Sequence, residues 1–128
     1  MNICLDTRLL EEIAASNDIQ KNWFINVLKN SDNHVFLPSI VISEFVSESL
    51  NKRDINQTDS LIDWLCKTNL IILGLNVSIA REAGKLQYQY RFGIGDCIVV
   101  ATAIYCKSKY IRTDQNEFEK VKGVKTFF

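Results

Sequence analysis

The sequence predicts a single α/β domain built on a mostly parallel sheet of about five strands. Short apolar runs alternate along the chain with longer segments in which apolar residues recur at helical spacing, the pattern of β–α–β units. The chain has 128 residues, with one proline and five glycines. This composition suits long regular elements in one domain without a flexible linker.

Five short apolar runs are expected to form the strands. They are Asn2–Leu5, Val35–Leu37, Leu70–Leu73, Lys109–Arg112 and Val124–Phe127. Right-handed crossovers between them would make neighbouring strands parallel, so their carboxyl ends would lie at one edge of the sheet. The last run is expected at the side of the sheet.

Helical segments fill the spaces between these runs. We expect helices over Leu9–Ala15, Ile19–Lys29, Ser39–Asn51, Ile55–Cys66 and Ser78–Tyr90, with Ser39 as the cap of the third. The segment Cys97–Cys106 is apolar on nearly every face, which indicates a buried helix. Asp96 stands directly before it, in the position expected of an N-cap.

Charge and cysteine usage narrow the class of protein. The net charge is zero, so the whole molecule is not a surface for a polyanion, although residues 105–128 carry six basic side chains against three acidic ones. The four cysteines form no C-x-x-C pair and are interpreted as small buried apolar residues in a reducing compartment. No signal peptide and no bilayer-spanning run is predicted, so we expect a cytoplasmic protein without membrane contact.

Four acidic residues are expected at the carboxyl edge of the sheet. Asp6 follows the first strand, Glu44 lies early in the helix after the second, Asp96 begins the buried helix, and Asp114 follows the fourth strand. Ligands of open α/β sheets bind at this edge. Clustered carboxylates repel one another unless a cation lies between them, and oxygen ligands suit Mg²⁺ or Mn²⁺. Such an ion can activate water against a phosphodiester.

Each acid also has a structural interpretation. Asp6 and Asp96 can simply cap helices, and Asp114 can form a turn. Glu44 is harder to explain in this way, because it lies within an apolar stretch where an unpaired acid is seldom buried. Glu48, one turn later, is either an accessory ligand or a surface charge. The convergence of four acids on one edge favours a site.

Several short motifs resemble those of the PIN domain family, and among its branches the VapC-type toxins of prokaryotic toxin–antitoxin pairs. The motifs are Ile3–Thr7, Ser43–Phe45, Gly95–Ala103 and Thr113–Asp114 with Phe118. The resemblance covers residues 1–128 and implies a three-layer α/β/α fold. It also implies a Mg²⁺- or Mn²⁺-dependent endoribonuclease that acts on RNA, forms a homodimer and is held inactive by a small antitoxin. By position, Asp6, Glu44 and Asp96 match the metal-binding acids.

The fourth site position departs from the family pattern. In many relatives the last acid is the second residue after the threonine, and here Gln115 stands there, while the acid is one residue earlier, at Asp114. We predict Asp114 as the fourth catalytic and metal-binding acid. Gln115 can bind a metal-bound water but supplies no charge, and Thr113 is expected to hydrogen-bond near the site.

Two other functions are also compatible with the sequence. One is a catalytically degenerate PIN-like domain that binds RNA or a protein. This alternative is supported by Gln115, which is neutral where many relatives have an acid. A receiver-type signalling domain is a less favoured α/β alternative, because Asp6 lacks the acidic neighbour that such domains need. The single histidine, His34, leaves no triad chemistry.

Three arginines are expected near the carboxyl edge. Arg8, Arg91 and Arg112 can each contact phosphate there, or be ordinary solvated residues.

Overall fold

A computed structural model describes all 128 residues and confirms the α/β class. The sheet contains β1 (Asn2–Leu5), β2 (His34–Pro38), β3 (Ile71–Leu73), β4 (Tyr110–Arg112) and β5 (Lys125–Phe127). Their order is β3-β2-β1-β4-β5, and every neighbouring pair is parallel. The sheet is therefore parallel throughout, and its strands end together at what we call the carboxyl edge.

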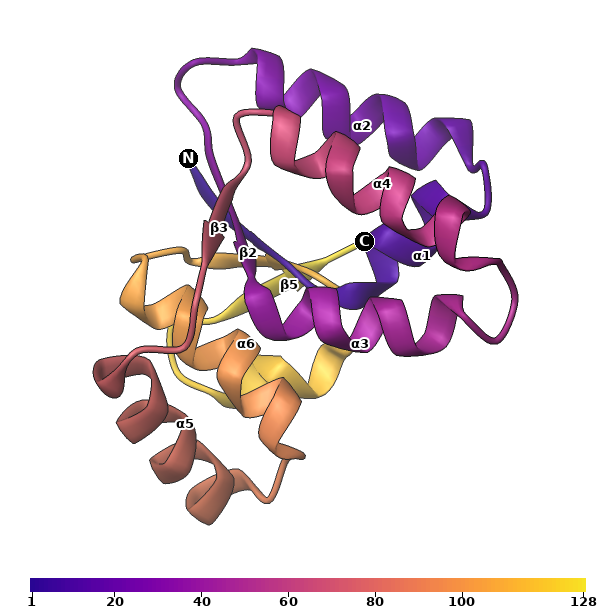
Figure 1. The fold of residues 1–128 in the computed structure, drawn as a ribbon. Helices are drawn as coiled ribbons and strands as arrows, with labels where there is room; N and C mark the ends of the chain where they lie inside the picture. The colour runs from indigo at the N-terminus through magenta and orange to yellow at the C-terminus, as the bar shows by residue number, and fades with distance from the viewer.

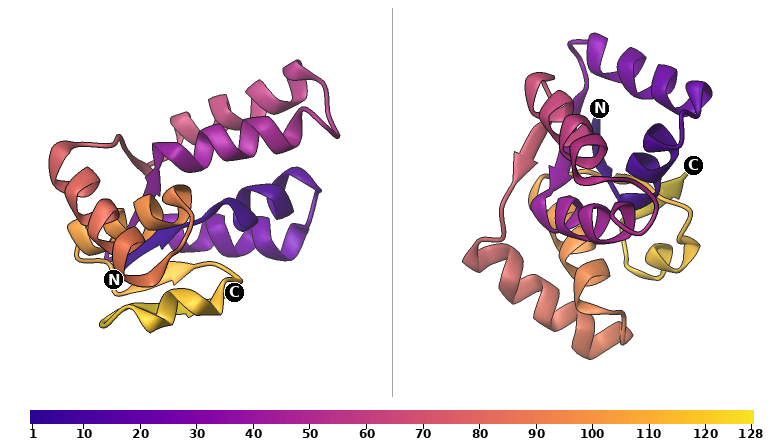
Figure 2. Two further views of the ribbon diagram at one scale, coloured as in Figure 1. Left: turned by 90° about the horizontal axis from the view of Figure 1, so that it is seen from below. Right: turned by 45° about the vertical axis from the view of Figure 1, so that its right-hand side comes forward.

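The helices form a layer on each side of this sheet. They are α1 (Thr7–Ala14), α2 (Asp18–Lys29), α3 (Ser39–Ser49), α4 (Ile55–Lys67), α5 (Val77–Tyr90) and α6 (Ile94–Tyr105), followed by the 3₁₀ helix η1 (Asn116–Lys120). Helices α2 and α4 lie on one side and α5 and α6 on the other (Figure 1). Helix α3 leaves the carboxyl end of β2 and contacts both α1 and α6, as further views also show (Figure 2). The three-layer expectation is confirmed.

The strand order excludes the receiver-type alternative. In that topology β1 lies between β2 and β3. Here β1 lies between β2 and β4, and β3 is at the far side of the sheet. The signalling-domain interpretation is therefore wrong.

Side-chain caps explain where several helices begin. Asn17 accepts a hydrogen bond from the Gln20 N–H at 3.3 Å, and Asn76 accepts one from the Ile79 N–H at 2.8 Å. Helix α4 begins with a capping box, in which the Asp54 carboxylate accepts from the Gln57 N–H at 2.8 Å while the Gln57 side chain accepts from the Asp54 N–H at 3.1 Å.

Two predicted caps are wrong. Ser39 is the first residue of α3, and Pro38 occupies the N-cap position without a side-chain bond, because its fixed φ of −63° already suits the turn from strand to helix. Helix α6 begins three residues earlier than expected, at Ile94, with Gly93 as its N-cap. Asp96 therefore lies inside the first turn and does not cap the helix.

The buried helix is confirmed for Cys97–Ala103, every residue of which is buried, whereas Ile104 and Tyr105 at the end of α6 are exposed. This helix contacts β1, β2 and β4 and fills the centre of one side layer. The expectation that all four cysteines are buried is wrong for Cys66, which faces solvent on the outer side of α4, and Cys106 is only partly covered. No helix has both the length and the apolar character needed to cross a bilayer.

Candidate active site

Asp6 is the buried centre of the acidic cluster. It follows β1, caps α1 and is only 4% exposed. Its Oδ1 accepts a hydrogen bond from the Thr7 N–H at 2.7 Å, and its Oδ2 accepts one from the Thr113 hydroxyl at 2.8 Å. The buried Thr113 in turn accepts from the Gln115 N–H at 3.1 Å. The end of β4 therefore fixes the carboxylate at the end of β1.

Glu44 enters from α3 and has an unsatisfied oxygen. Its Oε1 is buried and has no hydrogen-bond partner. Gly95 of α6 makes room for it, because a Cβ at that position would lie 3.2 Å from Oε1. A buried acceptor without a partner costs about 1–3 kcal/mol of folding free energy. The oxygen is thus in a state that a proton or a cation would relieve.

Asp96 reaches the cluster from the first turn of α6. Because it does not cap the helix, its carboxylate is available to other groups, and the Gln115 amide donates to its Oδ1 at 3.5 Å. Gln115 therefore contacts an acid of the cluster directly, from the segment that follows β4.

The three acids influence one another electrostatically. Burial raises the pKa of Asp6, and the charge of Asp114 raises it further, although hydrogen bonds to Asp6 act in the opposite direction. Burial likewise raises the pKa of Glu44, and the charges of Asp6 and Asp96 add to this. The pKa of Asp96 is raised by burial and then by Asp6. Negative charge is therefore concentrated at this edge, and hydrogen bonds offset only part of its cost.

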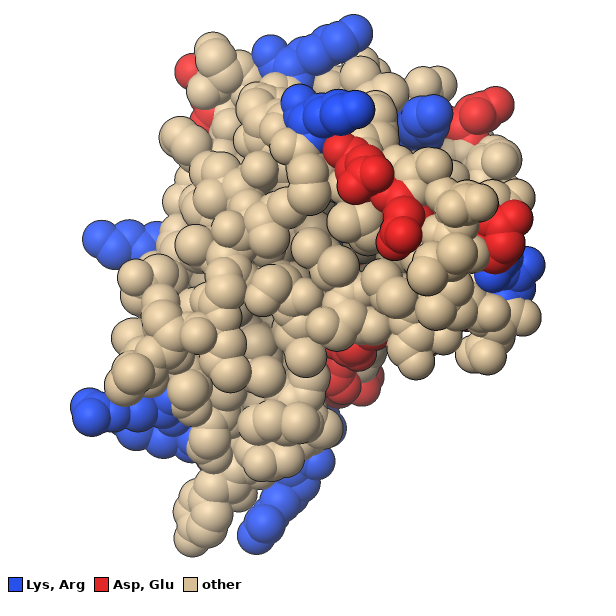
Figure 3. Space-filling model, viewed as in Figure 1, with Lys and Arg blue, Asp and Glu red and all other residues tan.

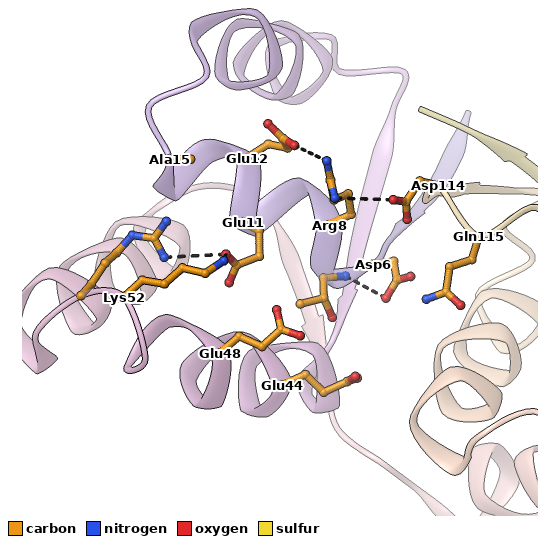
Figure 4. A pocket seen from close by; sticks show the side chains of 12 residues that line it. Asp6, Arg8, Glu11, Glu12, Ala15, Glu44, Glu48, Lys52, Asp114 and Gln115 are labelled. Atoms are coloured by element: carbon orange, nitrogen blue, oxygen red, sulfur yellow. Dashed lines mark hydrogen bonds and ion pairs between the residues drawn. The ribbon is translucent and has the colours of Figure 1, made fainter.

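Asp114 lies at the border of the cluster. Its half-exposed carboxylate is 3.7 Å from a guanidinium nitrogen of Arg8, which also contacts Glu12 at 2.7 Å. In Figure 4 Asp114 faces Arg8, whereas Gln115 points toward the Asp6 carboxylate. The two candidates for the fourth position are thus both at the site, in different directions.

An open cavity of about 490 Å³ extends from this cluster between α1 and α3. Its lining is mostly charged and consists of Asp6, Thr7, Arg8, Glu11, Glu12, Ala15, Glu44, Glu48, Lys52, Arg53, Asp114 and Gln115. Six of these residues are acidic and three are basic. At the end away from β1, Lys52 and Arg53 lie 3.6 and 3.7 Å from the Glu11 carboxylate. The cavity therefore joins an acidic centre to a basic end.

The donor set suits a hard divalent cation. All candidate ligands are carboxylate oxygens, which Mg²⁺ and Mn²⁺ prefer, and the unpartnered Glu44 oxygen and the raised pKa values are consistent with a cation between them. No three acidic, cysteine or histidine side chains are close enough to hold one ion as they stand. Side-chain movement is therefore needed to close the set.

Some residues were misjudged or missed from sequence. Arg112 is not available to phosphate, because it is only 5% exposed and its guanidinium stacks 4.0 Å from the centre of the Trp23 ring. Gly95 could have been noticed, since a glycine beside a candidate acid often marks close approach. Glu11 and Arg53 gave no local signal, because they meet only where α1 packs against α3 and the turn that follows it.

The fold and the site together define a three-layer α/β protein with an acidic cluster at the carboxyl edge of a parallel sheet. The family model of the PIN domain matches residues 3–124. The chain belongs to the PIN domain family.

Several solved structures share the fold. VapBC2 from Rickettsia felis, crystallised with a DNA fragment from its promoter, is 19% identical, with a TM-score of 0.80 over 99% of this chain and 98% of that one. A toxin–antitoxin complex from Klebsiella pneumoniae is 19% identical, with a TM-score of 0.74 over 97% of this chain and 96% of that one. Mycobacterium tuberculosis VapC20, a sarcin–ricin loop cleaving toxin, is 10% identical, with a TM-score of 0.75 over 92% of this chain and 93% of that one. No curated protein matches the chain by sequence.

Replacement of Glu44 by glutamine should stabilise the metal-free protein at neutral pH. A carboxyl whose pKa is raised on folding lowers the free energy of unfolding once it is ionised, and it contributes nothing below its unfolded pKa of about 4.3. Melting curves of Glu44→Gln and wild type in chelator should therefore coincide near pH 4, and the variant should melt higher as pH rises.

Glu119 provides a control of opposite sign. Its pKa is lowered by the hydrogen bond from the Thr126 N–H, so Glu119→Gln should melt below wild type at neutral pH, and the difference should fade as pH falls. If Glu44→Gln loses stability relative to wild type as pH rises, burial and neighbouring charges do not destabilise the ionised Glu44.

Proposed function

We propose that this PIN domain is a Mg²⁺- or Mn²⁺-dependent endoribonuclease and the toxin of a toxin–antitoxin pair. The observation that carries the proposal is the buried, unpartnered Oε1 of Glu44, beside two further acids whose pKa values are raised. Membership of the PIN domain family supports a nuclease, and the similarity of fold to toxin–antitoxin proteins supports the toxin assignment.

In this proposal Asp6, Glu44 and Asp96 hold the ion, and Asp114 adds the fourth acid. When bound, the ion activates water and offsets the charge of the scissile phosphodiester. The chain's own residues keep the acids in place. Thr113 holds Asp6 through its hydroxyl at 2.8 Å, and Gln115 restrains Asp96.

The basic residues around the cavity would bind the RNA backbone. Arg8 lies on one wall, and Lys52 and Arg53 lie at the far end. Each is paired with an acid of the same cavity, at 2.7–3.7 Å, so a phosphate group would have to replace those contacts. This arrangement favours a polyanion that occupies the whole cavity over a single small anion.

No histidine is near the proposed reaction centre. His34 is the first residue of β2, at the edge opposite the acids. The histidine pair that usually activates a ribose 2′-hydroxyl is therefore missing from this site, so attack by water is the chemistry that we propose. The products should then carry 5′-phosphate and 3′-hydroxyl ends.

We also propose the partners that the family resemblance implies, namely RNA as substrate, a second copy of the chain as a homodimer, and a small antitoxin. The similar fold in a toxin–antitoxin complex supports the antitoxin. A cytoplasmic location is part of the same proposal.

Purified protein should cleave RNA in Mg²⁺ or Mn²⁺, and Asp96→Asn should reduce the rate at least about 100-fold, since loss of even an outer hydrogen-bond partner of a metal ligand costs 10–100-fold. A chelator should abolish cleavage, and added metal should restore it. Asp59→Asn, an exposed change on α4, is the matched control and should keep full activity.

Cleavage that survives the chelator, or 2′,3′-cyclic phosphate ends, would exclude this mechanism. Folded wild type with no activity on any RNA would favour the degenerate binding domain.

The fourth position can be assigned by comparing Asp114→Asn with Gln115→Ala. If Asp114 supplies charge to the ion, its substitution should lower the cleavage rate by about 10-fold or more, whereas Gln115→Ala should cost less. Rates at several Mn²⁺ concentrations separate weakened metal affinity from lost chemistry. The reverse order of damage would assign the position to Gln115 and leave Asp114 as the partner of Arg8.

A further inference from the structure

The end of α5 presents an exposed aromatic side chain beside an unpaired cation. Tyr88 is 78% exposed, and the Arg91 guanidinium lies 5.6 Å from the centre of its ring. Together with Gly84, Gln87 and Phe92 they border an open hollow of about 440 Å³, which we call the Tyr88 hollow. No carboxylate lies within ion-pair distance of Arg91.

Gly84 borders this hollow, and no packing contact in the fold explains why this residue is a glycine. It lies in the middle of α5, one turn before Tyr88, where glycine weakens a helix relative to alanine. A Cβ at Gly84 would meet no atom within 4 Å, so nothing in the fold requires the residue to be small. What glycine does provide is a depression in the surface next to the Tyr88 ring.

Arg91 is held in a conformation that arginine seldom adopts. It ends α5 with a φ of 63°, in the left-handed region, and its N–H donates to the Gln87 carbonyl at 3.0 Å. The surrounding surface is basic, since α5 and its C-cap carry Arg81, Lys85 and Arg91 but only one acid, Glu82. Figure 3 shows basic side chains over α5 in the lower part of the view, below acidic side chains in a recess at its centre.

The hollow is fixed to the acidic cluster from two directions. Arg91 and Asp96 are five residues apart, so their Cα atoms are at most roughly 17 Å from each other. The Phe92 ring stacks on the Tyr90 ring, with the ring centroids 5.6 Å apart, and its centroid lies 5.9 Å from that of the buried Phe118 in η1. Helix η1 begins directly after Gln115. The hollow is therefore within a few nucleotides of the proposed cleavage site.

We propose that the Tyr88 hollow binds one unpaired nucleobase of an RNA strand, with the base stacked on Tyr88 and the adjoining phosphate on Arg91. Every base has a face that can stack on an aromatic ring, and an arginine next to it supplies the charge for the backbone. A base within a duplex cannot enter, because it is already stacked and paired. This inference rests on the proposed function for its substrate, and it adds a requirement for single-stranded RNA beside the cut.

The direct test is the affinity of each full-length variant for a labelled, unstructured RNA oligonucleotide, measured by fluorescence anisotropy in chelator so that no cleavage occurs. Tyr88→Ala should weaken binding by about 5- to 150-fold, the range for loss of one base–aromatic stack. Tyr88→Phe should keep the wild-type affinity, because the ring remains. Arg91→Asn, which tolerates the left-handed backbone, should weaken binding and reduce its salt dependence.

Gly84→Leu separates binding from folding. Leucine strengthens the helix but fills the hollow, so the variant should melt higher than wild type and yet bind RNA more weakly. Tyr105→Ala removes a half-exposed tyrosine at the other end of α6 and should change nothing. Tyr88→Ala and Gly84→Leu should leave the affinity for duplex RNA unchanged.

Unchanged affinity in Tyr88→Ala would overturn the inference. So would a change in sedimentation mass in that variant, which would assign Tyr88 to a contact between protein chains. Binding that depends on Tyr88 in a protein that cleaves no RNA would support the hollow and contradict the proposed function, so the two can fail separately.

Discussion

The main constraint on this structure is the cost of burying, side by side, the carboxylates that the parallel sheet brings to one edge. Asp6 follows β1, Glu44 lies on the helix that leaves β2, and Asp96 approaches from the other side layer. Burial raises the pKa of all three, and the charge of neighbouring acids raises each pKa further. Their surroundings offset part of this cost, since Thr7 and Thr113 donate to Asp6 and Gln115 donates to Asp96. Glu44 receives no such donor at Oε1, which leaves the cluster short of positive charge.

Helix α6 gives this cluster its geometry. Because its residues Cys97–Ala103 are all buried, the helix is fixed against β1, β2 and β4, and its first turn has one position relative to the sheet. That turn carries Asp96, and beside it Gly95, whose missing side chain lets Glu44 of α3 come close. The same turn continues back to Phe92 and Arg91, so the packing that positions the acids also positions the Tyr88 hollow.

Much of the fold could be predicted from the sequence because its signals are local. The five apolar runs became the five strands, and the apolar segment Cys97–Cys106 marked the buried helix. The acids at the carboxyl edge followed from topology, since parallel strands end together. Properties that depend on packing between segments far apart in the chain could not be predicted from the sequence. Arg112 was expected near phosphate or solvent but is enclosed by aromatic side chains, and Asp96 was expected to cap a helix that begins earlier. The ion pair of Arg53 with Glu11 joins the turn after α3 to α1, which is far away in the sequence.

The most direct test of the account is the thermal stability of the protein with and without a divalent cation. A ligand that binds only the folded state raises the free energy of unfolding by about 2.7 kcal/mol at one hundred times its dissociation constant. Millimolar Mg²⁺ or Mn²⁺ should therefore raise the melting temperature of wild type, and the increase should be much smaller in Asp6→Asn, whereas Asp59→Asn should respond as wild type does. An equal increase in wild type and Asp6→Asn would contradict a shared cation site at the carboxyl edge.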